Sequence, residues 1–135
     1  MTGPKPPFIV NSMLLCPAAS HSSPTSTSCD TTSFDAPVMI GEFHFGAHDR
    51  GLFGASLINK GSQEGRAAAL KRYVESALAN PQVVGVHWHQ FSDQATSGRF
   101  DGEYFQVGWT DICDRPYAEP VAALRAIDLY PTRAR

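Results

Sequence analysis

Residues 37–44 read Pro37-Val38-Met39-Ile40-Gly41-Glu42-Phe43-His44. A short continuous apolar run that ends on a carboxylate predicts a strand buried on both faces of a sheet. A second run of the same kind, Val83-Val84-Gly85-Val86-His87-Trp88, occurs later in the chain. Strands with this pattern are typical of parallel sheets that are covered by helices.

Between the two runs the sequence predicts a helix from Ser62 to about residue 80. Ser62 is a good N-cap, and Glu64 follows in the first turn. Arg66 is expected to lie off the buried face, and Asn80-Pro81 ends the helix. The buried face is expected to contain the apolar residues at helical spacing, namely Ala67, Leu70, Tyr73, Val74, Ala77 and Leu78.

After the second strand we expect a long polar loop over about 90–117, with a short extended piece at 104–109. A last helix is predicted over 118–129, with Pro120 in its first turn. Its inward residues would be Val121, Leu124 and Ile127. The order strand, loop, helix, strand, loop, helix gives two βα units and an α/β fold with a parallel sheet.

Residues 1–36 differ in composition from the rest of the chain. They are rich in Ser, Thr and Pro, and we interpret them as a mostly disordered leader to a domain over 37–135. The apolar run that begins at Phe8 is interrupted by Asn11 and Ser12, so it is not a convincing secretion signal. The sequence therefore leaves the location of the protein open.

The formal net charge of −2 argues against a nucleic-acid partner. No apolar run is long enough to cross a membrane as a helix, so no membrane partner is expected. The three cysteines, Cys16, Cys29 and Cys113, are odd in number and form no CxxC pair. We expect neither a disulfide framework nor a zinc site, and we expect Cys113 to be a buried thiol.

Glu42 and Trp88 are the candidates for chemistry, because both end predicted strands. A carboxylate held by a sheet at a pocket mouth suits a nucleophile or a general acid or base. The alternative is an ion pair of Glu42 with Arg50 or Arg99. Trp88 either provides a flat surface on which the CH face of a sugar can stack, or it packs in the hydrophobic core.

Polar residues that could contact sugar hydroxyls follow both strands. They are His44, Gln90 and Asp93, with Arg99 and Glu103 further along the second loop. A metal site is not expected, because the pair His44 and His48 follows a strand rather than lying on a helix. Nor does an acidic or cysteine ligand stand at a suitable spacing from His87 and His89.

Several of these stretches together resemble glycoside hydrolase family 50 β-agarases. The matching blocks are Ile40-Gly41-Glu42-Phe43-His44-Phe45-Gly46-Ala47, Asp49-Arg50-Gly51, Ser62-Gln63-Glu64, Gly85-Val86-His87-Trp88 with Gln90 and Asp93-Gln94, Thr96-x-Gly98-Arg99-Phe100-Asp101-Gly102-Glu103, and Asp111-Ile112-Cys113-Asp114-x-Pro116-Tyr117. They cover about residues 37–130. The resemblance implies a partial (β/α)8 barrel, in which this chain supplies strands seven and eight with their helices.

The resemblance also implies roles. Glu42 matches the nucleophile, Trp88 matches the floor of the sugar subsite, and the peptide after Trp88 would be cis. The implied reaction is retaining hydrolysis of β-galactosidic bonds in agarose or neoagaro-oligosaccharides, with neither a metal nor an organic cofactor. Members of the family are typically secreted.

The sequence departs from the family in one large respect. The partner glutamate normally follows an Asn, and this chain has no Asn-Glu pair. Two βα units cannot close a barrel, and their strands would have open edges that invite self-association. We therefore expect the chain to be inactive alone. The alternatives are a non-catalytic carbohydrate-binding fragment, an inert fragment, or a β-galactosidase-like member of the same clan.

Overall fold

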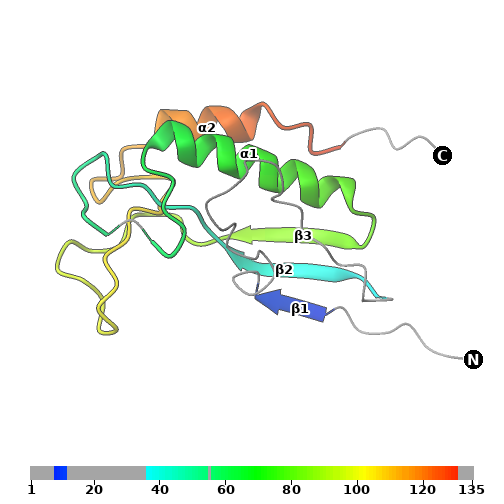
Figure 1. Ribbon diagram of the computed structural model, residues 1–135, viewed down its shortest axis with the longest axis horizontal. Coiled ribbons are helices and arrows are strands. Elements are labelled where there is room, and N and C mark those ends of the chain that lie inside the picture. Colours follow the sequence, from blue (N-terminus) through cyan, green and yellow to red (C-terminus); the bar gives the residue numbers. More distant parts are fainter. Residues whose placement is uncertain (1–7, 12–35, 55, 131–135) are drawn as a thin grey trace, which may run out of the picture. The chain divides into compact units, whose positions relative to one another are not determined.

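The computed structural model describes residues 8–11, 36–54 and 56–130. The elements, in chain order, are β1 (Phe8–Asn11), β2 (Val38–Phe43), α1 (Gln63–Ala79), β3 (Val83–Trp88) and α2 (Ala118–Arg125) (Figure 1). The chain divides into two compact units. Unit 1 comprises Met1–Phe43 and Arg72–Trp88, and unit 2 comprises His44–Lys71 and His89–Arg135.

Unit 1 contains a parallel sheet in the order β1-β2-β3 (Figure 1). The predicted strands at 38–43 and 83–88 and their parallel pairing are confirmed. In the central strand β2, Val38 and Ile40 are completely buried and Phe43 is nearly so. This burial on the central strand is what the continuous apolar run predicts.

Strand β1 lies within the segment that the sequence analysis assigned to a disordered leader. At Phe8–Asn11 the structure differs from that expectation, because these residues pair in parallel with β2. The physical reason is that Phe, Ile and Val favour extended backbone, and the edge of β2 supplies hydrogen-bonding partners for it. The other residues of the segment 1–35 lie outside the described residues.

Strand β3 is less buried than the sequence analysis expected. All six of its residues are partly or fully exposed, and Val84 is 58% exposed. Among the described residues β3 pairs with β2 alone, so it is an edge strand of the sheet. A strand in that position is covered less completely than a central one.

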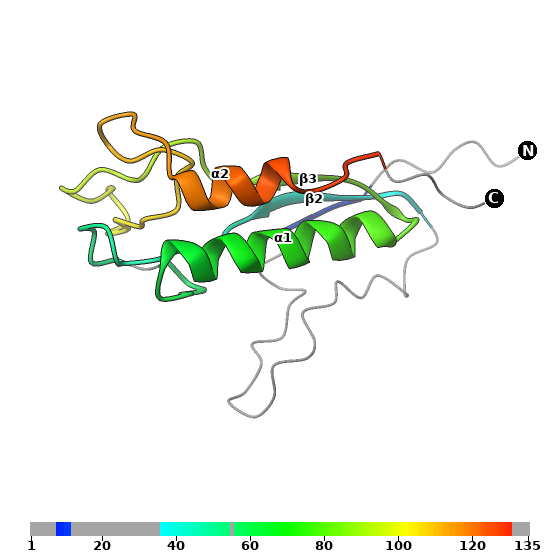
Figure 2. The same ribbon diagram turned by 90° about the horizontal axis from the view of Figure 1, so that it is seen from above.

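Helix α1 connects β2 to β3, and residues 72–79 of it, which belong to unit 1, run back along the strands in the opposite direction (Figure 1 and Figure 2). It begins where expected, since the hydroxyl of Ser62 accepts a hydrogen bond from the amide of Gly65 at 3.2 Å. The carboxylate of Asp49 accepts a second one from the amide of Gln63 at 2.9 Å. In unit 1 the ring of Tyr73 on α1 stacks on Phe43 of β2, with centroids 4.4 Å apart.

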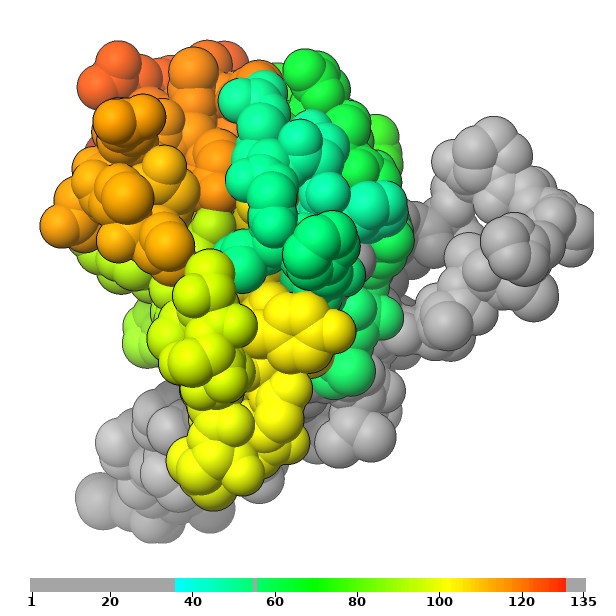
Figure 3. Space-filling view, turned by 90° about the vertical axis from the view of Figure 1, so that its left-hand side faces the viewer, coloured from blue at the N-terminus to red at the C-terminus, as the bar shows by residue number. Residues whose placement is uncertain are grey.

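In unit 2 the loops that follow β2 and β3 are joined to each other (Figure 3). Ala47 forms an isolated antiparallel bridge with Gln106, and Gly54 forms a parallel one with Phe105. The stretch 104–109, expected to be extended, therefore connects the two loops through isolated bridges rather than forming a strand of its own. Both loops become parts of one folded unit.

Helix α2 ends earlier than predicted, at Arg125 instead of residue 129. The amide of Ala126 bonds to the carbonyls of Ala122 and Ala123, which tightens the last turn. Pro120 lies in the first turn and is buried, as expected. Ile127 is buried beyond the helix end, whereas Val121 and Leu124 are half-buried.

Cys113 is exposed, so the expectation of a buried thiol is wrong. The reason is its place in a surface turn, where the carboxylate of Asp111 accepts hydrogen bonds from the amides of Cys113 and Arg115 at 2.7 and 2.9 Å. Cys16 and Cys29 lie outside the described residues. In the part of the chain that the structure describes, no helix is long and apolar enough to cross a membrane.

Replacing Phe43 with Ala should destabilise the protein by about 3–5 kcal/mol, because it leaves a cavity between the rings of Tyr73 and Trp88. Thermal unfolding followed by circular dichroism measures the loss. The control is Phe53→Ala, since Phe53 is 89% exposed and its removal should change stability by less than about 0.5 kcal/mol. Equal effects of the two variants would contradict the packing described for β2.

Candidate active site

Glu42 lies in a β-bulge at the carboxyl end of β2. On the β3 side, Ile40 pairs with Val86 and Phe43 pairs with Trp88, so Gly41 and Glu42 together face one residue of β3. The register also shifts on the β1 side, between the pairs Val10 with Ile40 and Asn11 with Glu42. A bulge turns a side chain out of the regular alternation of the strand and is common beside active sites. Glu42 is partly exposed.

Trp88 is the last residue of β3 and lies beside the end of β2. Its ring contacts Phe43 edge-on, with centroids 5.2 Å apart and planes at 88°. One side of the indole is therefore packed, yet the residue remains partly exposed. The structure brings Glu42 and Trp88 to the same end of two adjacent parallel strands in unit 1, as the sequence analysis expected.

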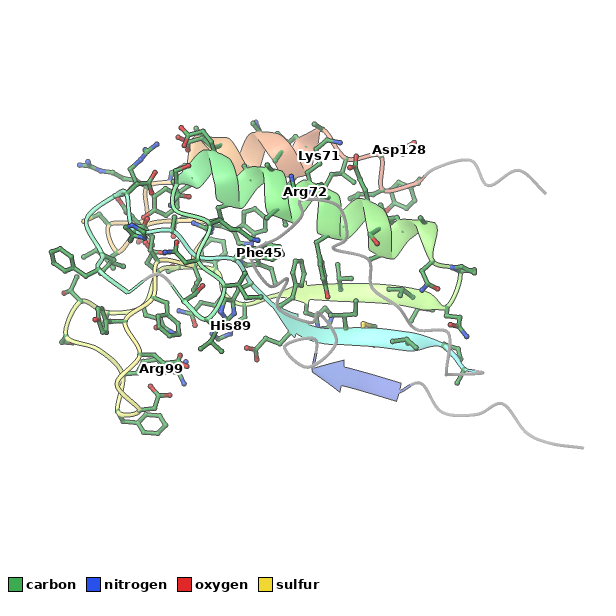
Figure 4. All side chains as sticks on the ribbon, viewed as in Figure 1. Phe45, Lys71, Arg72, His89, Arg99 and Asp128 are labelled. Atoms are coloured by element: carbon green, nitrogen blue, oxygen red, sulfur yellow. The ribbon has the colours of Figure 1, made fainter. Side chains whose placement is uncertain are left out.

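His44 belongs to unit 2 and is 5% exposed. Its ring lies 5.7 Å from that of His89 and 6.4 Å from that of Phe105, measured between centroids. Figure 4 shows His89 at the start of the loop that follows β3. The structure therefore places His44 in the interior of unit 2, although the sequence analysis proposed a sugar contact for it.

Gln90 is partly buried and donates a hydrogen bond from Nε2 to the carbonyl of Ser92 at 2.8 Å. The peptide bond between His89 and Gln90 is cis. The resemblance implied a cis bond directly after Trp88, so that expectation is off by one peptide.

Asp93 is a buried carboxylate with both oxygens engaged inside unit 2. Its Oδ1 accepts a hydrogen bond from the amide of Gly108 at 2.7 Å, and its Oδ2 accepts one from the hydroxyl of Tyr117 at 2.6 Å. Burial raises the pKa of Asp93 and outweighs the lowering effects of Tyr117, Gly108 and the charge of Arg66. Burial, together with the hydrogen bond to Asp93, also raises the pKa of Tyr117. Asp93 thus organises the loop rather than facing out of it.

Arg66 is completely buried on α1, although the sequence analysis expected it off the buried face. The cause is its hydrogen bonding, since the guanidinium donates to Oε1 of Gln63 at 2.8 Å, to the carbonyl of Val107 at 2.8 Å and to the carbonyl of Gly108. It also lies over the ring of Tyr117, 5.4 Å from the centroid. Burial lowers the pKa of Arg66 to about 10, so the guanidinium stays charged at neutral pH.

Arg99 lies at the tip of the loop after β3 (Figure 4), and Glu103 is joined to it there by an ion pair. Arg99 pairs with Asp101 at 2.8 Å and with Glu103 at 3.4 Å. Glu103 also accepts a hydrogen bond from Nε2 of Gln94 at 2.8 Å. Gly102 has a φ of 87°, which favours glycine in this turn. The two predicted contact residues are therefore neighbours in one ordered turn.

The two arginines considered as partners of Glu42 have other ion pairs. Arg50 pairs with Glu119 and lies 3.8 Å from the carboxylate of Asp49, while Arg99 pairs within the loop tip. Across the described ranges, no group of three histidine, cysteine, aspartate or glutamate residues is arranged to hold a metal ion.

The buried polar network of unit 2 escaped the sequence analysis. The amide Nε2 of Gln63 donates to Oε1 of Gln106 at 2.9 Å, and Oε1 of Gln94 accepts from the amide of Phe105 at 2.7 Å. These glutamines are 2% exposed or less. The one available signal was the position of Gln63 and Arg66 on the helical face that also carries Leu70 and Tyr73.

The chain is similar in sequence and structure to agarases, although no family model matches it. Beta-agarase B of Vibrio sp. (strain JT0107) is 43% identical over 102 residues, which cover 73% of this chain. An exo-beta-agarase structure is 46% identical over 66% of the chain, with a TM-score of 0.64. The structure of PfGH50B is 43% identical over 70% of it, with a TM-score of 0.67.

The chain spans a small part of each of these proteins. It covers 11% of beta-agarase B, 12% of the exo-beta-agarase and 14% of PfGH50B. The likeness therefore concerns one α/β segment with parallel strands, which resembles part of the agarase structures.

The raised pKa of Asp93 makes a testable contribution to stability. A carboxyl with a raised pKa in the folded state stabilises fully below its ordinary value of 3.8, and this contribution is lost as the pH rises through the folded pKa. Relative to Asp93→Asn, the wild type should therefore be most stable at acid pH. Melting midpoints of both proteins across a pH series measure this difference. A wild-type advantage that increases with pH would contradict the assignment.

Proposed function

We propose that this chain is the nucleophile-bearing part of a retaining glycoside hydrolase that cleaves β-galactosidic bonds in agarose or neoagaro-oligosaccharides. In this proposal β2 and β3 are strands seven and eight of a (β/α)8 barrel. Glu42 is the nucleophile and Trp88 is the floor of the sugar subsite. The observation that carries the proposal is the partly exposed Glu42 in the bulged end of β2, in a chain whose relatives are named agarases.

The parallel strand ends give the proposal its physical basis. In parallel α/β folds, sites form at the carboxyl ends of the strands, where Glu42 and Trp88 both lie. The bulge turns the backbone at Glu42, while the buried Phe43 beside it packs against Tyr73 and Trp88. A nucleophile needs such a rigid support, because its approach to the anomeric carbon must be held to a fraction of an ångström.

Retaining hydrolysis requires a second carboxyl group about 5–5.5 Å from the nucleophile, to protonate the leaving oxygen. The 135 residues contain no Asn-Glu pair to supply it in the family's manner. We therefore propose that the chain alone does not hydrolyse agarose, whose leaving group needs that proton.

A substrate with an activated leaving group tests Glu42 without the missing acid. With a dinitrophenyl 2-deoxy-2-fluoro-β-galactoside, the Glu42 carboxylate would form an ester with the anomeric carbon, and dinitrophenolate would leave without protonation. We expect intact-protein mass spectrometry to show one added fluorogalactosyl group, and peptide mapping to find it on Glu42.

Glu42→Gln should abolish this labelling, and Glu75→Gln is the matched control because Glu75 is an exposed glutamate on α1. Labelling that persists in Glu42→Gln, or that maps to another residue, would overturn the role of Glu42. Binding of neoagaro-oligosaccharides without any labelling would favour the alternative of a non-catalytic carbohydrate-binding fragment.

Trp88→Ala should weaken binding of neoagaro-oligosaccharides by about tenfold or more, equivalent to about 1.4 kcal/mol, because the flat ring that packs on the sugar is lost. Trp88→Phe keeps a smaller ring against Phe43 and should retain part of the affinity. The upward shift of the melting midpoint with added oligosaccharide reports binding to the folded state. Equal shifts in the wild type and in Trp88→Ala would exclude Trp88 from the subsite.

A further inference from the structure

Arg66 is a buried arginine whose guanidinium donates hydrogen bonds to the main chain of a loop. The guanidinium bonds to the carbonyls of Val107 and Gly108 and to the side chain of Gln63 one turn earlier on α1. Its charge is balanced at longer range by Asp93, which raises the pKa that burial lowers. The planar guanidinium offers several donors in a fixed fork, which suits it to holding two adjacent carbonyl groups.

Gly108 is held from both sides. Its amide donates to Asp93 at 2.7 Å, while its carbonyl accepts from Arg66. A Cβ at this position would meet backbone atoms of Ser92, Asp93 and Thr110 at 2.2 to 2.4 Å, so another residue could not be accommodated without moving the chain. Gly108 therefore packs directly against the main chain of Ser92, Asp93 and Thr110.

The same residues join the two ends of the loop after β3. The amides of Trp109 and Thr110 donate to the carbonyl of Phe91 at 2.6 and 3.1 Å, and the amide of Asp93 donates to the carbonyl of Thr110 at 2.9 Å. We call this pairing of 91–93 with 107–110 the loop neck. Residues 94–106, which include Gln94, Arg99 and Glu103, connect the two sides of the neck.

We propose that Arg66 is a positioning residue that clamps the loop neck to α1 and thereby orients the ion-paired tip of the loop for an oligosaccharide. The inference rests on the proposed function, because it assigns the tip side chains Arg99 and Glu103 to the recognition of sugar hydroxyls, while the buried Gln94 holds Glu103 by a hydrogen bond at 2.8 Å. Arg66 acts through the loop and touches no substrate itself.

The energetics favour positioning over simple stabilisation. Burying a charge costs free energy, and replacing buried ionic groups with apolar ones of similar volume is often neutral or stabilising. A core that needed only stability at this place would be served by an apolar side chain. The guanidinium instead supplies directional bonds to two specific carbonyls, which define where the neck lies.

The test compares Arg66→Met and Arg66→Lys with the wild type. Each variant is first checked for a cooperative melt, and neoagarohexaose affinity is then measured by calorimetry well below every midpoint. We expect Arg66→Met to lose affinity roughly tenfold to a hundredfold, since small displacements of a site have effects of that size. Arg66→Lys should recover part of the loss. The control pair Arg72→Met and Arg72→Lys changes an exposed arginine on the same helix and should bind like the wild type.

Hydrogen exchange of the amides in 94–106 provides a second readout. The clamp predicts faster exchange in this loop for both Arg66 variants, while the amides of β2 and β3 stay as protected as in the wild type. If Arg66→Met does not fold, the affinity and the hydrogen exchange are both measured on Arg66→Lys. Wild-type affinity and loop protection in a folded Arg66 variant would overturn the inference and leave the proposed function intact. If the wild type itself does not bind neoagarohexaose, the proposed function fails first.

Discussion

The burial of one guanidinium group controls how the loop after β3 folds. Arg66 is 0% exposed, and a charge in that position is tolerated only when oxygen atoms surround it. The carbonyls of Val107 and Gly108 supply those atoms, so residues 107 and 108 must stay in contact with Arg66 on α1. Asp93 lies on the other side of Gly108 and accepts the amide of the same residue. The loop thus adopts the conformation that surrounds the buried guanidinium with oxygen atoms.

In the proposed function the sheet and the loops have separate roles. In unit 1 the stacked and edge-on rings of Tyr73, Phe43 and Trp88 form an aromatic support at the strand ends, next to the bulge that contains Glu42. In unit 2 the buried side chains of Arg66, Asp93 and Gln94 bond to main-chain groups of the loops, which is how proteins keep an irregular backbone ordered. A rigid sheet suits a reacting carboxylate, and a polar loop suits the recognition of hydroxyl groups.

The elements with a strong repeating pattern could be predicted from the sequence, and those set by long-range contacts could not. The apolar runs gave β2 and β3, and the cap at Ser62 with Pro81 gave both ends of α1 within one residue. The burial of Arg66 depends on carbonyls some forty residues away, which helical spacing cannot reveal. Cys113 was misjudged because thiols are usually buried, whereas the Asp111 turn keeps this one at the surface. The short β1 pairs with a neighbour distant in sequence.

The position of Glu42 depends both on a local sequence pattern and on long-range contacts. Its place at the end of an apolar run was visible in the sequence, but the bulge that reorients it is not, because a bulge depends on the register with both neighbouring strands. A regular strand would direct residues 41 and 42 to opposite faces and keep them in step with β3. The extra residue at this point interrupts that alternation, so the surrounding sheet, through its register, determines the backbone from which Glu42 projects.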